Sequence, residues 1–418
     1  MESFRIEGGV PLSGTVRVDG AKNAALPACI AGLLTDESVV LHRVPQLRDV
    51  STILYTLGAL GRRVVRHGDH VSIAAGEGLS AEADAYSVRQ MRASFLVLAP
   101  LVARLGRAVV PLPGGCAIGR RPIDLHLDGL RALGARVEER DGAVLVTAGR
   151  LIGAHIALPY PSVGATEQIL MAASLASGET VIENGAIEPE VEDLACLLRK
   201  MGAEIEIEID DRTIRIHGRE KLGGAEHTLI PDRMEAGTFL LAGAMTGGRV
   251  TVEGVRSDHL TPFLRPLEST GADLAIEAEA VTVHGPMRPL PAEVVAAPHP
   301  GFPTDLHPPF VAYLALAAGS SSLVESVFEG RFAYVDALCK MGAQIARAGT
   351  TLTITGVESL QGRAVAATDI RAGAALVLAG LAAYGYTRVT QLEHIDRGYS
   401  SFGEKLRSLG ARIERRDG

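Results

Sequence analysis

Two kinds of apolar pattern alternate along the chain. Short segments with an apolar residue at every second position, such as 144–147 and 281–284, end near a glycine and predict half-buried β-strands. After each one comes a loop and then a segment rich in Ala and Leu, apolar on most sides, which is typical of a buried helix. Such helices are predicted over 21–32, 91–100, 164–173, 234–243, 307–319 and 370–380. This alternation of strands and helices predicts a layered α/β fold with right-handed crossovers.

A second pattern recurs six times and sets a period for the chain. Each copy reads Leu, two residues, then Leu, Met or Thr, then Gly, two residues and a hydrophobic residue, as in 130–137. It predicts the end of an amphipathic helix, a glycine cap and a strand. The shared glycines, 68 to 73 residues apart, are Gly61, Gly134, Gly202, Gly271, Gly342 and Gly410. The pattern therefore predicts the same order of elements in each unit of about 70 residues: a strand, a buried helix, a second strand, an amphipathic helix and a hairpin of strands.

The two ends of the chain predict how the six units are grouped. The sixth copy stops one strand short, and residues 4–8 form a strand of the missing type with no helix before it. We therefore expect the N-terminal strand to complete the last unit, so that both termini belong to one domain. We predict a domain over residues 1–19 and 230–418, a second over 20–229, and a ligand site in the cleft between them.

Composition narrows the class of protein. With 47% hydrophobic and 22% charged residues, the 418-residue chain is an ordinary globular sequence. A net charge of −8, few aromatic residues and no Trp argue against a nucleic-acid partner, although a local group of arginines can still bind a small anion.

Location is indicated by what the sequence lacks. Neither a signal peptide nor an apolar run of membrane-spanning length is visible, so we expect no membrane insertion. The four cysteines lie far apart and suit free thiols in a reducing cytoplasm.

Polar residues gather where the buried helices are predicted to start. Free N–H groups and the positive end of the helix dipole favour phosphates and carboxylates there. These residues are Lys22 with Asn23, Arg92, Ser162 with Thr166, Asp232 with Arg233, Asp305, and Asp369 with Arg371. Helix caps and salt bridges between units are the ordinary interpretation, and Ser162, Asp232 and Asp369 fit it. Lys22 fits it less well, because the chain has 36 Arg and only 5 Lys, which hints at a specific requirement for Lys.

Two loops carry the strongest candidates for chemistry. The loop 112–126 is longer and richer in glycine than its counterparts, which suits a lid, and Cys116 has two arginines within five residues, which favours a reactive thiolate. A surface loop with an incidental cysteine is the alternative. Asp305 lies in the proline-rich segment 298–310, where a fixed carboxylate could act as a general base or as a helix cap.

Several kinds of site are not indicated. The sequence has no P-loop, no zinc-protease motif, no clustered Cys and His, no dinucleotide fingerprint and no nucleophile elbow. We therefore expect neither a metal nor a cofactor.

The motifs together resemble one family over essentially the whole chain. The segments 20–27, 91–94, 114–126, 162–166, 231–240, 302–306, 327–332, 368–380 and 394–399 follow the order seen in the UDP-N-acetylglucosamine 1-carboxyvinyltransferase family of enolpyruvyl transferases. GGCAIGRRPID and HIDRGY are the most specific of them. The resemblance implies an inside-out α/β barrel in two similar domains of three repeats each.

The resemblance also implies an activity. Members of this family transfer the enolpyruvyl group of phosphoenolpyruvate to the 3-hydroxyl of UDP-N-acetylglucosamine and release phosphate, in the first committed step of peptidoglycan synthesis. By resemblance, Cys116 protonates the methylene carbon of phosphoenolpyruvate and Asp305 takes the proton of the sugar hydroxyl. Lys22 and Arg397 complete the implied catalytic set.

The remaining implied residues bind the two substrates. Asn23 would polarise the reacting centre, while cations hold the phosphate and carboxylate of phosphoenolpyruvate. These cations are Lys22, Arg121, Arg331, Arg371 and Arg397. The sugar nucleotide would contact Arg92, Arg121, Pro122, Ile123, Asp124, Leu125, Ser162, Val163, Gly164 and Val327. The resemblance leaves the oligomeric state open.

Departures from the family pattern leave open which molecule accepts the enolpyruvyl group. Arg48, Tyr160 and Ile187 differ from the usual residues near the acceptor, and Gly330 and the segment after Asp305 differ too. The alternatives are the same chemistry on another uridine nucleotide, the shikimate-pathway enolpyruvyl transferase, an RNA-end-processing enzyme and a protein that only binds a nucleotide sugar. The last has no need of Lys22, Cys116, Asp305 and Arg397 together.

Overall fold

The computed structural model describes residues 2–113 and 123–417, and these form two compact units. Residues 2–19 and 231–417 make up unit 1, and residues 20–113 and 123–230 make up unit 2. The chain leaves unit 1 after Asp19 and returns to it after Ile230.

Unit 1 contains three four-stranded sheets built on one plan. Each has two antiparallel pairs and one parallel pair, the parallel pair lying at one edge. In spatial order the sheets are β21 (Ala364–Ala366), β22 (Tyr386–Thr390), β1 (Ser3–Glu7) and β23 (Arg412–Arg416); β15 (Asp273–Ile276), β16 (Ala280–His284), β14 (Arg249–Glu253) and β2 (Ser13–Arg17); and β17 (Glu293–Ala296), β18 (Ser320–Glu325), β20 (Thr351–Thr355) and β19 (Gln344–Ala348).

The sheets of unit 2 follow the same plan, except that one has three strands. They are β11 (Glu204–Glu208), β12 (Thr213–His217), β10 (Glu179–Glu183) and β9 (His155–Ala157); β13 (Ala225–Thr228), β3 (Val39–His42), β5 (His70–Ala75) and β4 (Arg62–His67); and β6 (Arg107–Pro111), β8 (Ala143–Thr147) and β7 (Arg136–Arg140). In the three-stranded sheet, the place of a parallel edge strand is taken by a single bridge between Glu82 and Val109.

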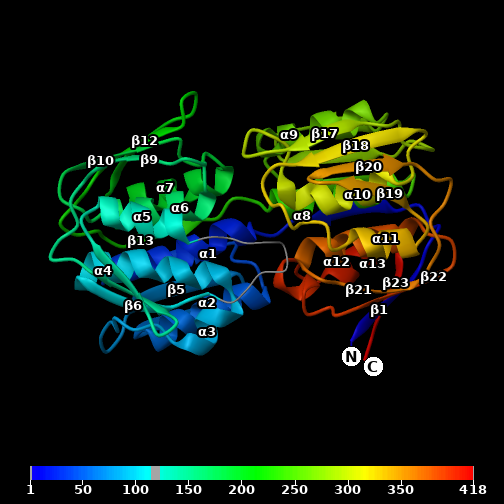
Figure 1. The fold of residues 1–418 in the computed structure, drawn as a ribbon. Helices are drawn as coiled ribbons and strands as arrows, with labels where there is room; N and C mark the ends of the chain where they lie inside the picture. Colours follow the sequence, from blue (N-terminus) through cyan, green and yellow to red (C-terminus); the bar gives the residue numbers. More distant parts are fainter. Residues whose placement is uncertain (1, 114–122, 418) are drawn as a thin grey trace. The chain divides into compact units, whose positions relative to one another are not determined.

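The Ala- and Leu-rich helices form the interior of each unit. In unit 1, α8 (Arg233–Met245), α10 (His307–Leu314) and α12 (Ile370–Ala382) contact one another, and every residue of α8 and α10 is buried. Unit 2 places α1 (Lys22–Ala31), α4 (Leu98–Leu105) and α6 (Val163–Ala173) in the same role. In Figure 1, α8, α10 and α12 lie between strands of unit 1 above and below them. Helices inside and sheets outside confirm the predicted inside-out α/β fold.

Amphipathic helices complete the repeats. They are α2 (Arg48–Ala59), α5 (Asp124–Ala132), α7 (Pro189–Lys200), α9 (Ser257–Ser269), α11 (Val335–Lys340) and α13 (Phe402–Ser408). Each is followed by one of the six repeat glycines, and all six have φ between 87° and 103°. A side chain would be strained in this left-handed conformation, so the predicted glycine caps are confirmed.

The first strand of the chain lies within the sheet of the last repeat. β1 pairs antiparallel with β22 on one side and with β23 on the other, and its Phe4 and Ile6 point into the core of unit 1. Residues from the two ends of the sequence therefore build one hydrophobic layer.

One helix differs from its predicted form. Instead of a helix over 91–100, the chain forms α3 (Ala85–Gln90), the 3₁₀ helix η2 (Arg92–Val97) and then α4. Pro100 lies in the first turn of α4, where its missing N–H breaks no intrahelical hydrogen bond. The other short helices are η1 (Gly32–Leu34), η3 (Thr304–Leu306) and η4 (Ile395–Arg397).

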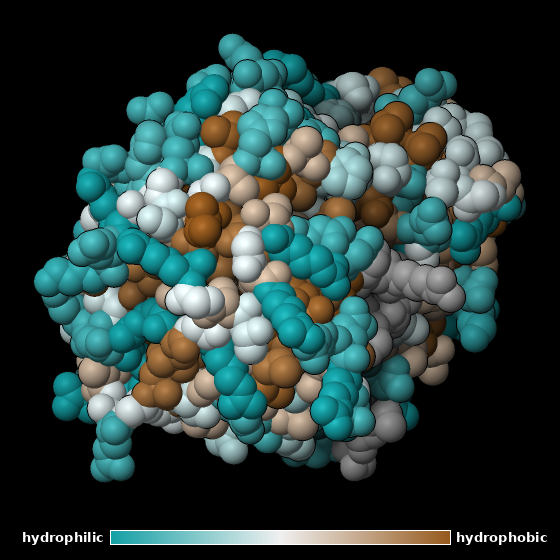
Figure 2. Space-filling model, turned by 60° about the vertical axis from the view of Figure 1, so that its left-hand side comes forward, coloured by the Kyte–Doolittle hydropathy of each residue, from teal (hydrophilic) through white to brown (hydrophobic). Residues whose placement is uncertain are grey.

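The surface seen in Figure 2 is mainly hydrophilic, with hydrophobic residues in small groups between polar ones. This follows from strands that bury alternate residues and leave the others outside. Across the described part of the chain, none of the helices has both the length and the apolar character needed to cross a membrane.

Candidate active site

Asp305 is held between two arginines of unit 1. The residue lies in η3, just before the buried helix α10. Its Oδ1 accepts a hydrogen bond from Arg331 Nη1 at 2.6 Å, and its Oδ2 accepts from Arg371 Nη2 at 2.8 Å and Nε at 3.1 Å. Burial alone would raise the pKa of Asp305, but the charges of Arg371 and Arg331 outweigh it and hold that pKa well below its usual range. The carboxylate is therefore firmly ionised, and it caps no helix.

The two arginines keep further donors beside this carboxylate. Both side chains are almost fully buried, whereas 22% of the Asp305 side chain remains exposed. Arg331 Nε and Arg371 Nη1 are buried and have no hydrogen-bond partner in the described part of the chain. Buried guanidinium donors without a partner are costly, so these atoms suit an anionic ligand that would accept from them. Arg397, in η4, is half-buried in the same unit.

A buried network fixes the loops that carry these residues. Glu325 Oε2 accepts from Thr304 Oγ1 at 2.7 Å and lies 2.8 Å from His307 Nδ1, while its Oε1 accepts from the backbone N–H of Val327 at 2.8 Å. The Tyr334 hydroxyl lies 2.7 Å from His307 Nε2. One carboxylate thus ties the residue before Asp305 to the segment that contains Val327 and leads to Arg331.

Sequence reasoning missed this network. His307 and Glu325 are completely buried as a pair, yet they lie 18 residues apart in the sequence. A buried His or Glu is rare unless it is paired, so the available signal was the position of His307 at the start of the helix predicted to be buried over 307–319.

Lys22 forms the corresponding ion pair in unit 2. It is the first residue of α1, and its Nζ lies 2.7 Å from Asp49 Oδ2 in the first turn of α2. Both side chains are at least nine-tenths buried, while the neighbouring Asn23 is exposed. The rarity of Lys in the chain indicated a specific requirement at this position, and the structure shows Lys22 in a buried ion pair with Asp49.

His126 connects three predicted substrate-binding segments of unit 2. Burial and, to a smaller extent, the charge of Arg92 lower its pKa to about 4, although Gln168 and Asp124 oppose the shift. A Cβ added to Gly164 would lie 2.9 Å from His126 Cε1, so a larger residue there would have to displace the imidazole. One neutral imidazole therefore lies beside three of the predicted binding segments. They are Arg92, the segment Ile123, Asp124 and Leu125, and the helix start at Ser162, Val163 and Gly164.

The predicted helix caps are confirmed. Asp232 accepts from the backbone N–H groups of Met234 and Glu235, and Asp369 accepts from those of Arg371 and Ala372, all at 2.8 to 3.0 Å. Ser162 accepts from Ala165 at 3.4 Å. The Asp369 cap also fixes the start of the helix that carries Arg371.

Three predicted site residues, Cys116, Arg121 and Pro122, lie outside the described residues. In the part of the chain that the structure covers, no three His, Cys, Asp or Glu side chains gather as metal ligands.

Comparison with known proteins gives the family. The model of the family described as EPSP synthase (3-phosphoshikimate 1-carboxyvinyltransferase) matches residues 6–406. UDP-N-acetylglucosamine 1-carboxyvinyltransferase 2 of Carboxydothermus hydrogenoformans is 52% identical, with 99% of each chain covered. UDP-N-acetylglucosamine 1-carboxyvinyltransferase of Finegoldia magna is 48% identical, again with 99% of each covered. This chain belongs to the enolpyruvyl transferase family. It is an enzyme, a transferase, as the resemblance of its motifs implied.

Solved structures of enolpyruvyl transferases share its fold. The enolpyruvyl transferase NikO from Streptomyces tendae matches with a TM-score of 0.91 and 28% identity, over 99% of this chain and 98% of that one. EPSP synthase from Acinetobacter baumannii matches with a TM-score of 0.78 and 21% identity over the whole of both chains, a likeness that concerns the fold alone.

Proposed function

We propose that this enolpyruvyl transferase moves the enolpyruvyl group of phosphoenolpyruvate to the 3-hydroxyl of UDP-N-acetylglucosamine and releases phosphate. Two relatives that share about half of its residues over their full length carry the name of this activity. The observation that carries the chemistry is Asp305, ionised between two buried arginines that still have donors to offer. The proposal places the enzyme at the first committed step of peptidoglycan synthesis, in the cytoplasm, with neither metal nor cofactor.

The arginines of unit 1 would bind phosphoenolpyruvate. This substrate carries a phosphate and a carboxylate, and guanidinium groups hold both by paired, charge-assisted hydrogen bonds. We assign this role to Arg331, Arg371 and Arg397, with Arg121 and Lys22 contributing further positive charge. Because the ammonium group of Lys22 is paired with Asp49, the substrate anion must compete with that carboxylate for it.

Substrate binding would also activate Asp305. A carboxylate that accepts from two arginines is a weak base, because protonating it breaks both ion pairs. When phosphoenolpyruvate takes some of the arginine donors, Asp305 loses stabilisation and its pKa rises. The base thereby becomes competent once the first substrate is bound.

The reaction would then proceed by addition and elimination. Asp305 accepts the proton of the sugar 3-hydroxyl as that oxygen bonds to C2 of phosphoenolpyruvate, and Cys116 gives a proton to the methylene carbon, C3. Asn23 polarises the reacting centre. In the second step the Cys116 thiolate takes a proton from C3, the double bond reforms, and the C2–O bond to phosphate breaks, so that phosphate leaves with the bonding electrons.

The segments around His126 would bind the sugar nucleotide. Arg92 and the helix start at 162–164 offer a cation and free N–H groups, which suit a diphosphate. By resemblance we assign Pro122, Ile123, Asp124 and Leu125 to the same ligand, together with Val327, whose backbone N–H is held by Glu325.

Phosphate release tests the proposal. The purified enzyme is incubated with phosphoenolpyruvate alone, with UDP-N-acetylglucosamine added, and with UMP added instead. The proposal predicts release only with UDP-N-acetylglucosamine. Release only with UMP would keep the chemistry and overturn the acceptor, and no release with either nucleotide would overturn the activity.

A further inference from the structure

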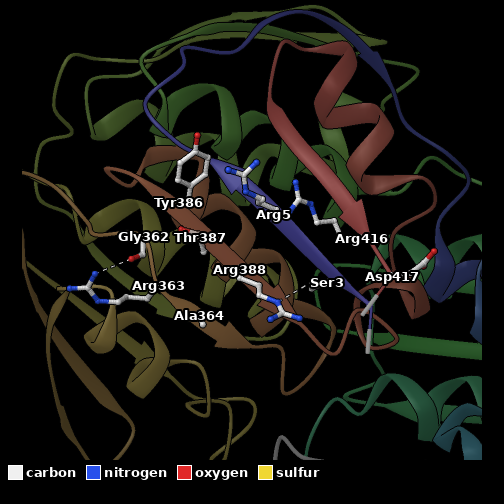
Figure 3. A pocket seen from close by; sticks show the side chains of 10 residues that line it. All are labelled: Ser3, Arg5, Gly362, Arg363, Ala364, Tyr386, Thr387, Arg388, Arg416 and Asp417. Atoms are coloured by element: carbon white, nitrogen blue, oxygen red, sulfur yellow. Dashed lines mark hydrogen bonds between the residues drawn. The ribbon is translucent and has the colours of Figure 1, made fainter.

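A second group of arginines lies in unit 1 on the outer face of the sheet β21-β22-β1-β23. A cavity of about 620 Å³ opens over this face, a volume common among small-molecule sites. Four arginines line it: Arg5, Arg363, Arg388 and Arg416. Figure 3 shows Arg5, Arg388 and Arg416 on the adjacent strands β1, β22 and β23, with Arg363 at the margin. None of the four belongs to the proposed active site.

Most of these positive charges have no acidic partner. Arg416 pairs with Glu414 at 2.7 Å, so the Glu414 that stands opposite Arg5 in the register is already engaged. Arg388 Nε donates to Ser3 Oγ at 3.2 Å, and Arg363 Nη1 donates to the carbonyl oxygen of Gly362 at 3.0 Å. No described carboxylate forms a salt bridge with Arg5, Arg363 or Arg388, although Asp417 also lines the cavity.

The strand register sets two of these charges against each other. Arg5 of β1 and Arg388 of β22 are directly paired residues on the same face of the sheet. Like charges in this position repel each other and destabilise a sheet unless an opposite charge lies between them. The Arg5 guanidinium instead lies 4.0 Å from the centre of the Tyr386 ring, a half-exposed aromatic group on the same strand as Arg388.

The repeats supply an internal comparison for this position. The corresponding pair in each of the other five sheets holds at most one charge. These pairs are Thr251 with Thr282, Ser322 with Thr353, Val181 with Arg215, Val40 with Ser72, and Val109 with Leu145. Within the described residues, two paired arginines at this position occur in one sheet of six, so the fold itself does not call for them.

We propose that this cavity binds a small phosphorylated ligand. A phosphate accepts bidentate hydrogen bonds from guanidinium groups and would neutralise the paired charges of Arg5 and Arg388. The Tyr386 ring offers an apolar face for the rest of the ligand, and Arg363 and Arg416 offer further donors at the rim. General composition does not explain the local excess of positive charge, since the chain carries a net charge of −8. The inference is independent of the proposed function.

Binding of radiolabelled inorganic pyrophosphate, measured by equilibrium dialysis, tests the proposal. The variant Arg5→Thr/Arg388→Thr places in this sheet the pair that Thr251 and Thr282 form in a neighbouring one. The control Arg17→Ser/Arg249→Ser removes two exposed arginines from that neighbouring sheet and changes the net charge equally. Pyrophosphate bound by the active-site arginines adds the same amount of binding in all three proteins. The test therefore compares the binding of the variant and of the control with that of the wild type.

The expected result is loss of one binding component in the Arg5→Thr/Arg388→Thr variant, with affinity weakened about tenfold or more, while the control matches the wild type. Arg363→Ala, which changes an exposed residue at the rim, should weaken the same component several-fold and does not touch the strand pair. Equal isotherms for all proteins would overturn the proposal, and so would equal losses in variant and control.

Sedimentation with phosphatidylglycerol vesicles separates a free ligand from a lipid headgroup. The proposal predicts that the protein stays in the supernatant. Sedimentation with vesicles that is lost in the Arg5→Thr/Arg388→Thr variant, without any pyrophosphate binding, would assign the face to a membrane surface and overturn the proposal.

Discussion

The two oxygens of Asp305 accept hydrogen bonds from different arginines, and this pairing determines what the carboxylate can do. Alone it would be a buried charge of high energy, but between Arg331 and Arg371 it is ionised and positioned. The sequence indicated Asp305 by its stiff, proline-rich loop. It gave no sign of which arginines would reach it, because Arg371 lies 66 residues further along the chain.

Replacing Asp305 by Asn keeps the shape of the side chain and removes the base. We expect product formation to fall on the order of a hundredfold or more, as is usual for loss of a general base, with both substrates still bound. Single-turnover kinetics and calorimetric binding measure the two effects separately. Asp258→Asn, which changes an exposed carboxylate paired with Arg256, is the control and should keep the wild-type rate. A wild-type rate in Asp305→Asn would assign the base elsewhere.

The four cysteines differ in what they can do. Burial raises the pKa of Cys29 to about 12, so this thiol stays protonated and unreactive. We predict that Cys116→Ala abolishes both turnover and covalent labelling by a thiol-directed epoxide, measured by mass spectrometry of the intact protein. Cys339→Ala, at an exposed position, is the control and should retain both. Full turnover in Cys116→Ala at neutral pH would remove this thiol from the mechanism.

At the scale of elements, α5, α6 and η2 meet around one uncharged histidine. Burial, reinforced by Arg92, lowers the pKa of His126 to about 4 in the folded state, compared with 6.5 for an ordinary histidine. Below about pH 6.5 the histidine of the unfolded chain therefore binds a proton, whereas the buried imidazole of the folded protein stays neutral until the pH approaches 4. The stability that this group contributes is complete above pH 6.5 and is lost as the pH falls towards 4.

His126→Asn should remove this pH dependence. Between pH 7 and pH 5, proton uptake by the unfolded state lowers the free energy of unfolding of the wild type by about 2 kcal/mol. Over the same interval the free energy of unfolding of the variant should fall by that much less. Urea unfolding at the two pH values measures the difference. His284→Gln, at an exposed strand position, is the control and should behave like the wild type. Equal losses in His126→Asn and the wild type would show that the imidazole does not stay neutral.

Elements were predictable where the pattern is local and periodic. Alternating apolar residues predicted β8 and β16, and the repeat glycines predicted the ends of the amphipathic helices. The start of α4 was not predictable in this way, because 3₁₀ and α-helix bury the same apolar residues. The pair of His307 with Glu325 depends on a tertiary contact between α10 and β18, for which one sequence carries no local signal.

At the scale of the whole molecule, the last repeat depends on the first strand of the chain. β1 is an interior strand of its sheet, and Ile6 on it is completely buried. We predict that Ile6→Ala destabilises the protein by about 2–5 kcal/mol, the usual cost of a cavity in a well-packed core. Urea unfolding measures the change, and Ile209→Ala, at a position that is 59% exposed, is the control. A loss for Ile6→Ala no larger than for the control would mean that the terminal strand is not integral to the fold.

In the proposed reaction, this chain attaches the enolpyruvyl group to the sugar of UDP-N-acetylglucosamine. The most direct measurement uses phosphoenolpyruvate labelled with ¹³C at C2, with UDP-N-acetylglucosamine as acceptor, and follows the labelled carbon by NMR. We expect the label to appear in an enol ether bonded to the 3-oxygen of the sugar, as phosphate is released. Label that remains in phosphoenolpyruvate, or that joins any other oxygen, would contradict the proposed reaction.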